Sequence, residues 1–273
     1  MINFSVLMSV YKFDDPIYVS LAIDSILNQS LMPNQVVIIV DGPISSNLSD
    51  TINTYESGHQ IISCYYLDEN RGLSYALNYG LEKCTYDYVA RMDSDDISLP
   101  HRFERQICYL DNNKDIALLG SWYAQYDESM LTFQILRMVP ELNADLIRYS
   151  KSRTPFNHVT AIFRKSKIID SGGYPDIEGL FEDWWLAHNL ISNGYRIHNL
   201  QEILVNVRGG KNFLNRRGGF KYLISEVSNL FNMYQAKHFT VFQLIKNLII
   251  RIPIRLLPNK FRFYIYALIR IKN

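Results

Sequence analysis

The strongest chemical signal in this sequence is a cluster of carboxylates. The segment R-M-D-S-D-D spans residues 91–96 and places Asp93, Asp95 and Asp96 directly after an apolar stretch typical of a buried strand. Carboxylates this close repel one another unless a cation or hydrogen-bond donors compensate their charge. Oxygen ligands at the carboxyl end of a strand suit Mg²⁺ or Mn²⁺ bridging a diphosphate. The alternative is a solvated acidic turn that caps the following helix.

The residues after this cluster add positive charge. In P-H-R-F-E-R-Q, residues 100–106, we expect Arg102 and Arg105 in the first turns of a helix. Cations at that end of a helix are poorly placed for its dipole but well placed for phosphates.

Two more polar segments follow expected strands. Asp41, in V-D-G, can accept a hydrogen bond from a base imide or a ribose hydroxyl, although an Asp in an ordinary D-G turn is equally compatible. In N-R-G, Gly72 allows close backbone approach as a helix opens. Arg71 can neutralise a diphosphate or simply pair with a neighbouring acid.

A fourth segment, F-E-D-W-W-L at 181–186, combines acids with aromatic rings. Glu182 and Asp183 start an expected helix, where acids are favourable as capping residues in any case. Trp184 and Trp185 add apolar rings that can raise the proton affinity of a carboxylate and stack on a sugar face. The segment is a candidate for a general base.

Alternating strands and helices must position these residues. Apolar runs at 2–10, 36–40, 61–67 and 87–92 alternate with helical patterns at 17–29, 45–57 and 72–84. This alternation predicts an α/β fold with a mostly parallel, doubly wound sheet flanked by helices. Later patterns indicate a mixed sheet with antiparallel strands: a helix at 100–112, runs at 116–123, 130–138 and 157–164, and a helix at 182–193 closed by Gly194.

Charge divides the 273 residues into two unequal parts. The formal net charge is +1, yet residues 203–273 hold 13 of the 28 Lys and Arg and one of the 27 acids, Glu226. Their net charge is therefore +12, against −11 for residues 1–202. We predict a catalytic domain at 1–208 and a basic, amphipathic helical extension at 209–273, with helices near 221–236, 240–251 and 259–270.

The extension has two interpretations. Its apolar face with a basic rim suits an anionic membrane interface, or the helices pack on the catalytic domain with their basic residues solvated. The basic residues of the rim are Lys246, Arg251, Arg255, Lys260, Arg262, Arg270 and Lys272.

Other features narrow the class of protein. The chain contains 48% hydrophobic and 20% charged residues, a composition that excludes a disordered protein and a fibrous repeat protein. Three cysteines without C-x-x-C spacing favour a reducing compartment over a disulfide framework or a zinc site. The N-terminus reads as a buried strand rather than a signal peptide, and no apolar run is long enough to span a bilayer.

Taken in order, the motifs resemble inverting glycosyltransferases of family 2, which have the GT-A fold. The resemblance covers about residues 3–208. Its matches are S-V-Y at 9–11, V-D-G at 40–42, N-R-G-L-S-Y-A-L-N at 70–78, D-S-D-D at 93–96, P-x-R-F-x-x-Q at 100–106, G-G-Y at 172–174 and E-D-W-W at 182–185.

The resemblance assigns roles to individual residues. It implies that Val10 and Tyr11 flank the nucleotide, Asp41 reads the uracil, Arg71 lies near the diphosphate and Asp93 touches the ribose or donor sugar. It further implies that Asp95 binds the divalent metal, Mn²⁺ or Mg²⁺, and that Asp183 is the catalytic base. Glu182, Trp184, Trp185 and His158 are candidates for the acceptor side, although a lone His before an apolar run is more often structural.

The run from M-S-V-Y-K to D-S-D-D resembles the bacterial subgroup that builds O-antigen and capsule repeat units, as in lipopolysaccharide biosynthesis. This implies transfer of one galactose or glucose from a UDP-hexose, often β-1,3, to an N-acetylhexosamine on undecaprenyl diphosphate. The Q-x-x-R-W signature of processive synthases is absent, which indicates single-sugar transfer. We expect a cytoplasmic enzyme, peripheral on the inner face of the bacterial inner membrane, without a nucleic-acid partner.

Two other functions fit parts of the sequence. A nucleic-acid-binding protein would use the basic tail and leave D-S-D-D as a mere turn. A nucleotidyltransferase would keep a similar fold, although this sequence lacks an N-terminal glycine-rich phosphate loop followed by Lys or Arg.

Overall fold

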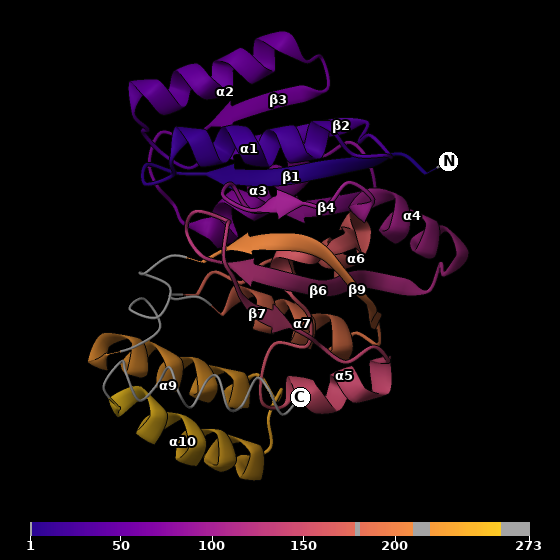
Figure 1. Ribbon diagram of the computed structural model, residues 1–273. Helices are drawn as coiled ribbons and strands as arrows, with labels where there is room; N and C mark the ends of the chain where they lie inside the picture. Colours follow the sequence, from indigo (N-terminus) through magenta and orange to yellow (C-terminus); the bar gives the residue numbers. More distant parts are fainter. Residues whose placement is uncertain (1, 178–180, 210–218, 258–273) are drawn as a thin grey trace.

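The computed structural model describes residues 2–177, 181–209 and 219–257 (Figure 1). Its strands form a nine-stranded sheet in the order β3-β2-β1-β4-β8-β6-β9-β5, with β7 paired to β6. The strands are β1 Phe4–Val10, β2 Gln35–Val40, β3 Ile62–Tyr66, β4 Tyr88–Met92, β5 Ile97–Ser98, β6 Ile116–Tyr126, β7 Phe133–Arg137, β8 Ile162–Arg164 and β9 Arg196–Arg208.

Strands β1 to β4 are parallel, as the alternation of strands and helices predicts. The expected strands lie within two residues of the observed ones. The run Q-V-V-I-I-V of β2 is buried from its second residue onward, because helices cover both faces of this part of the sheet.

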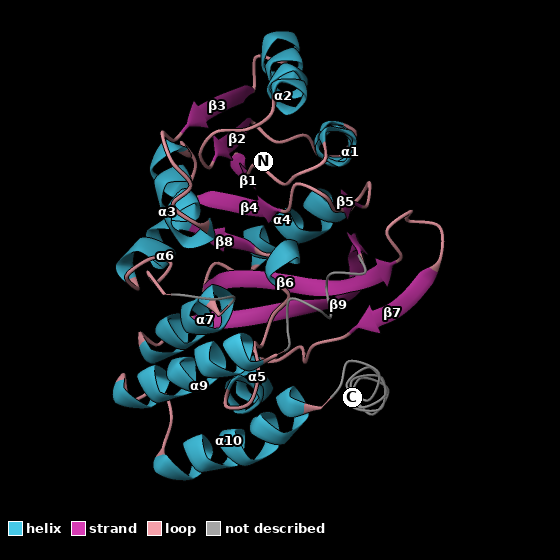
Figure 2. Cartoon of the chain, turned by 90° about the vertical axis from the view of Figure 1, so that its left-hand side faces the viewer, coloured by secondary structure: helices cyan, strands magenta, loops and turns pink. Residues whose placement is uncertain are grey.

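The helices form two layers around the sheet (Figure 2). One hydrophobic cluster joins α1, α2 and α4 to one face, and a second joins α3, α5, α6 and α7 to the other. The helices are α1 Pro16–Leu27, α2 Ser46–Gly58, α3 Leu73–Lys83, α4 Arg102–Asn112, α5 Asn143–Ser150, α6 Lys165–Asp170, α7 Glu182–Ser192, α9 Phe220–Gln235 and α10 Val241–Leu256.

The second half of the sheet is mixed, as predicted. Strand β8 lies antiparallel between β4 and β6, β7 is antiparallel to β6, and the long strands β6 and β9 are parallel. Strand β9 was not predicted, because polar residues interrupt its apolar pattern. Its register against β6 shifts three times. Helix α5 was missed as well, since its eight residues are too few for a clear period.

Helices α9 and α10 pack together at the end of the molecule opposite α2 (Figures 1 and 2). A third hydrophobic cluster joins them to α7 through Phe181, Trp184, Leu230, Met233 and Phe239. The pair therefore packs on the catalytic domain. The helix expected at 259–270 lies outside the described residues, and among those described no helix meets the length and hydropathy needed to cross a bilayer.

The prediction of a solvated basic rim is wrong for Arg251 and Arg255. Glu226 is fully buried and forms ion pairs with Arg251 and Arg255, whose side chains are only 19% and 10% exposed. Both arginines neutralise a buried carboxylate inside the helix pair, so neither is a solvated rim residue.

Candidate active site

The candidate nucleotide residues share one edge of the sheet. Val10 is paired with Val40 in the parallel register of β1 and β2, while β4 ends at Met92 beside β1. Tyr11, Asp41 and Asp93 each follow one of these strand ends, so parallel pairing brings them to a common edge. Val10 itself is buried in the core, whereas Tyr11 is 36% exposed.

Asp41 ties two motifs together. Its Oδ1 accepts a hydrogen bond from the Arg71 backbone N–H at 2.7 Å, and its Oδ2 accepts from the Gly72 N–H at 2.9 Å and the Asn70 side-chain amide at 3.0 Å. Gly42 has φ +86°, and a Cβ there would lie 2.4 Å from the backbone nitrogen of Asn70. Only glycine permits this approach, which makes V-D-G and N-R-G one unit.

The contacts of Asp41 give its carboxylate a structural role that the sequence does not reveal. Its carboxylate anchors the backbone that opens α3, and the Arg71 guanidinium is left above the Tyr75 ring at 3.9 Å. A carboxylate oxygen has two lone pairs, so Asp41 can still accept from a base. Its contact with uracil and that of Arg71 with the diphosphate remain predictions.

The D-S-D-D segment forms a cluster of negative charge with few counterions. Asp93 pairs with the buried Arg91, and the backbone N–H of Arg208 donates to Asp96 Oδ1 at 2.8 Å. Burial and the neighbouring Asp93 raise the pKa of Asp95 to about 6. Burial and the other two acids raise the pKa of Asp96 well above its ordinary value.

Asp14 is a fourth acid of this cluster, and it lies outside the sequence motifs. Its Oδ2 accepts the Tyr11 N–H at 3.0 Å and the Ser94 hydroxyl at 2.9 Å. Burial raises its pKa to about 6, and Asp95 and Asp93 add to the shift. Asp14 therefore connects the segment after β1 to the segment after β4, and only the folded chain shows this.

Arg208 is a second residue that the sequence did not reveal. Its Nε donates to the carbonyl oxygen of Asp95 at 3.0 Å, and its guanidinium stacks on the Tyr18 ring at 3.8 Å. The end of β9 thus holds the acidic segment in place.

The expected phosphate contacts of Arg102 and Arg105 are wrong. Arg102 is fully buried and donates to the carbonyl oxygen of Arg91 at 2.7 Å. Arg105 forms an ion pair with Glu202 at 2.5 Å. Arg102 instead binds the backbone of β4, just before the acidic segment.

Helix α7 begins with two acids in different surroundings. Glu182 is 8% exposed, and burial together with Asp183 raises its pKa to about 7. Asp183 is half-buried, and its Oδ1 accepts the N–H of Trp184 at 2.7 Å. Asp183 is thus the more accessible of the two carboxylates.

A chain of polar contacts links α3 to Glu182. The Asn78 side chain donates to the carbonyl oxygen of Tyr174 and accepts its N–H, both at 2.8 Å. The Tyr174 hydroxyl lies 2.9 Å from His158 Nε2, and His158 Nδ1 lies 3.8 Å from Glu182. Burial and Arg91 lower the pKa of His158 well below its ordinary value, so the ring is neutral.

This chain places His158 in the interior, where it supports Glu182 through packing rather than facing an acceptor. Trp184 is likewise 2% exposed, with its Nε1 donating to the carbonyl oxygen of Ser150 at 2.7 Å. Neither ring offers a face to a sugar. Trp185 is half-buried and donates to Asn229 Oδ1 at 2.5 Å, so it remains the aromatic candidate on the acceptor side.

The acidic cluster fits a divalent cation by its chemistry. Asp14, Asp93, Asp95 and Asp96 offer hard oxygen donors, and their mutual repulsion is only partly offset by Arg91 and Arg208. Within the ranges that the structure describes, no group of three or more His, Cys, Asp or Glu side chains is arranged to hold a metal by itself. This combination suits an ion that a carboxylate and substrate phosphates bind jointly.

Known proteins are similar to this chain over most of its length. Residues 5–223 match the model of the family "Glycosyl transferase family 2". The chain is 40% identical to an Escherichia coli UDP-Gal:alpha-D-GlcNAc-diphosphoundecaprenol beta-1,3-galactosyltransferase, over 97% of this chain and 95% of that one. It is 35% identical to the amylovoran biosynthesis glycosyltransferase AmsE of Erwinia amylovora, over 96% and 97%.

The fold also matches a solved structure, the mannosyltransferase PcManGT of Pyrobaculum calidifontis in complex with GDP-Man and Mn²⁺. The TM-score is 0.63 at 15% identity, covering 98% of this chain and 80% of that one. The α/β architecture expected from the sequence is confirmed. None of these matches supports the nucleic-acid-binding or nucleotidyltransferase interpretation.

Proposed function

This chain belongs to glycosyltransferase family 2, and on that premise we propose that it transfers one hexose, galactose or glucose, from a UDP-sugar to an N-acetylhexosamine on a lipid diphosphate. The linkage is β-1,3, and the product enters O-antigen or capsule repeat-unit synthesis at the inner face of the bacterial inner membrane. The observation that carries the proposal is the 40% identity to the E. coli galactosyltransferase over nearly the whole of both chains.

The donor is bound at the edge where β1, β2 and β4 end. Tyr11 and the backbone at Val10 flank the nucleotide, Asp41 reads the uracil imide, and Arg71 lies beside the diphosphate. Asp93 contacts the ribose or the donor sugar, with its charge held by Arg91. The clamp of Asp41 on N-R-G supports this arrangement, because it fixes the base-reading and phosphate-binding segments to one another before the donor arrives.

Asp95 would hold the divalent ion, Mn²⁺ or Mg²⁺, with the remaining acids of the cluster nearby. When bound, Mn²⁺ or Mg²⁺ offsets the negative charge that the departing UDP acquires. The excess of carboxylates over arginines in the cluster supports this role.

Asp183 is the general base. It removes the proton of the acceptor hydroxyl while that oxygen forms a bond to the anomeric carbon and the bond from this carbon to the UDP oxygen breaks. A single in-line displacement inverts the anomeric configuration, so an α-linked donor sugar becomes a β-glycoside. The greater accessibility of Asp183 relative to Glu182 supports this choice of base.

A panel of UDP-hexoses with a synthetic GlcNAc-diphosphate-lipid acceptor and Mn²⁺ tests the proposal. We expect a single hexose to be added from UDP-galactose or UDP-glucose, with a β-1,3 linkage visible by nuclear magnetic resonance. Chelator should abolish transfer, and Asp95→Asn should lower it at least about 100-fold while Asp68→Asn, an exposed acid outside the cluster, leaves it unchanged. Full transfer in chelator would contradict the metal role, and no transfer from any UDP-hexose would contradict the donor class.

A further inference from the structure

Helix α10 makes its inner contacts through polar side chains as well as Leu244, and it leaves several large apolar side chains exposed. On the inner side, Asn247 donates to the carbonyl oxygen of Lys151 at 2.9 Å, Arg251 donates to that of Ser152 at 2.5 Å, and Arg255 binds Glu226. A helix that borders water normally keeps polar side chains on its outer face. The outer face of α10 is instead mostly apolar, with Lys246 beside it.

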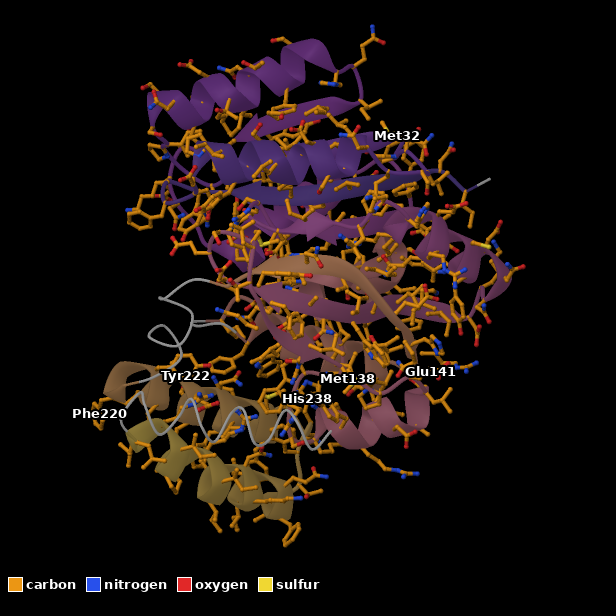
Figure 3. The ribbon with its side chains drawn as sticks, in the orientation of Figure 1. Met32, Met138, Glu141, Phe220, Tyr222 and His238 are labelled. Carbon is orange, nitrogen blue, oxygen red and sulfur yellow. The ribbon has the colours of Figure 1, made fainter. Side chains whose placement is uncertain are left out.

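The outer apolar face of α10 comprises Phe242, Ile245, Ile249 and Leu256. Spacings of three, four and seven residues put these side chains on one stripe of the helix, and they are 77%, 48%, 67% and 61% exposed; Ile250, 49% exposed, lies to one side of the stripe. Figure 3 shows a further apolar side chain, Phe220, at the end of the adjacent helix α9. Scattered exposed apolar residues are ordinary, but a contiguous stripe of this kind marks a contact surface.

The distribution of exposed apolar residues singles out this part of the molecule. Of 22 large apolar side chains exposed within the described ranges, ten lie in residues 220–256, a stretch of 37 residues. The remainder are spread over the much longer catalytic domain. The surface is therefore a property of the helix pair rather than of the chain as a whole.

Charge indicates which partner fits. The only acid of residues 203–273, Glu226, is fully buried between Arg251 and Arg255, while Lys237 and Lys246 are exposed. Residues 1–202 carry a net charge of −11, which an anionic membrane would repel. An acid-free apolar face flanked by lysines is the surface through which such a body can approach negatively charged lipid. A second copy of the chain would instead bring like-charged lysines together.

We propose that the outer apolar face of α10 inserts into the interface of an anionic phospholipid membrane, with the helix in the membrane plane and Lys246 among the lipid headgroups. The attachment reaches the catalytic site through packing. The Arg251 guanidinium lies over the Trp184 ring at 4.8 Å, and the Trp185 Nε1–H donates to Asn229 Oδ1 of α9, so the helix pair contacts the start of α7 directly. The inference concerns attachment and stands whichever sugar is transferred.

Co-sedimentation of the full-length protein with extruded vesicles tests this inference. Vesicles of phosphatidylcholine containing phosphatidylglycerol should bind the protein, and Phe242→Ser/Ile249→Ser should lower the partition coefficient at least about tenfold, since two large apolar side chains no longer leave water. Lys246→Glu should lower it a few-fold on the anionic vesicles only. Both changes lie on exposed positions, so circular dichroism should show an unaltered fold.

A matched control and two outcomes decide the matter. Met32→Ser/Ile169→Ser removes apolar side chains that are 43% and 54% exposed but far from α10 in sequence, and it should bind vesicles like the unaltered protein. The inference is overturned if Phe242→Ser/Ile249→Ser also binds unaltered. It is overturned equally if the unaltered protein ignores vesicles and instead forms a dimer that these two substitutions disperse. Vesicle binding without transfer of any hexose would leave attachment intact and contradict the proposed function alone.

Discussion

The carboxylates of the acidic cluster beside β4 and the buried Glu226 of the C-terminal helix pair have opposite pKa shifts. Burial, together with the repulsion of neighbouring acids, raises the pKa values of Asp14, Asp95 and Asp96. Glu226 is also buried, yet Arg251 and Arg255 neutralise it and lower its pKa. Uncompensated charge marks a place that awaits a ligand, while compensated charge marks internal structure.

The largest effect should come from the accessible carboxylate at the start of α7. We expect Asp183→Asn to lower kcat by about 1,000-fold or more, because the amide cannot take the acceptor proton while it still accepts the Trp184 N–H. Donor affinity should change little, which isothermal titration with UDP and Mn²⁺ would check. Glu182→Gln, at the buried neighbouring position, is the control and should retain kcat within about tenfold.

The compensated acid should affect stability instead of chemistry. Glu226→Gln leaves Arg251 and Arg255 buried without a counter-charge, and we expect the free energy of unfolding to fall by about 3 kcal/mol. Denaturant unfolding measures this. Glu202→Gln breaks the exposed pair with Arg105 and should cost less than about 1 kcal/mol. Equal losses in the two variants would mean that Glu226 is not the structural centre of the helix pair.

A pH series separates the two acids of α7 further. Burial raises the pKa of Glu182 from 4.5 to about 7, so the folded protein holds a proton that the unfolded chain releases. Its contribution to stability is therefore complete below about pH 4.5 and is lost as pH rises through 7. Glu182→Gln removes this dependence. The free energy of unfolding of this variant relative to the unaltered protein should therefore be higher at pH 8 than at pH 5, by up to about 3 kcal/mol. A stability difference that stays flat between these pH values would show that Glu182 is ionised in the fold.

The two regions also differ in how far the sequence anticipates them. Strand ends and the D-S-D-D, V-D-G and N-R-G motifs place Asp41, Arg71 and Asp95 at one edge, because parallel pairing leaves little freedom there. The helical period of α4 contained the information that Arg102 is buried. Phe103, Ile107 and Leu110 define a buried face, and Arg102 and Gln106 lie on it. Periodicity alone, by contrast, does not show which side of α10 packs on the protein. The same apolar stripe would be expected whether it faces the core or the solvent.

Contacts between distant segments explain the remaining misses. Arg208 reaches the acidic cluster from a strand more than a hundred residues away, and His158 meets Tyr174 across the segment that holds β8 and α6. Local patterns carry no record of such pairs. Residues that hold the site in place, such as Arg208 and Asp14, therefore cannot be found from the sequence alone.

The smallest effect we expect tests one of these holding residues. Asp14→Ala removes the acceptor that joins the Tyr11 N–H to the Ser94 hydroxyl, so the nucleotide and acidic segments lose their link while Asp95, the proposed metal ligand, remains. KM for the UDP-sugar should rise about tenfold with a smaller change in kcat, because loose positioning weakens donor binding before it affects proton removal. Asp14→Asn, which keeps an acceptor oxygen, should recover most of the loss. Asp15→Ala, which removes only the cap of α1, should cost about 1 kcal/mol of stability and leave KM unchanged. If Asp14→Ala and Asp15→Ala alter KM alike, the loop after β1 acts through its general stability and not through the bridge to Ser94.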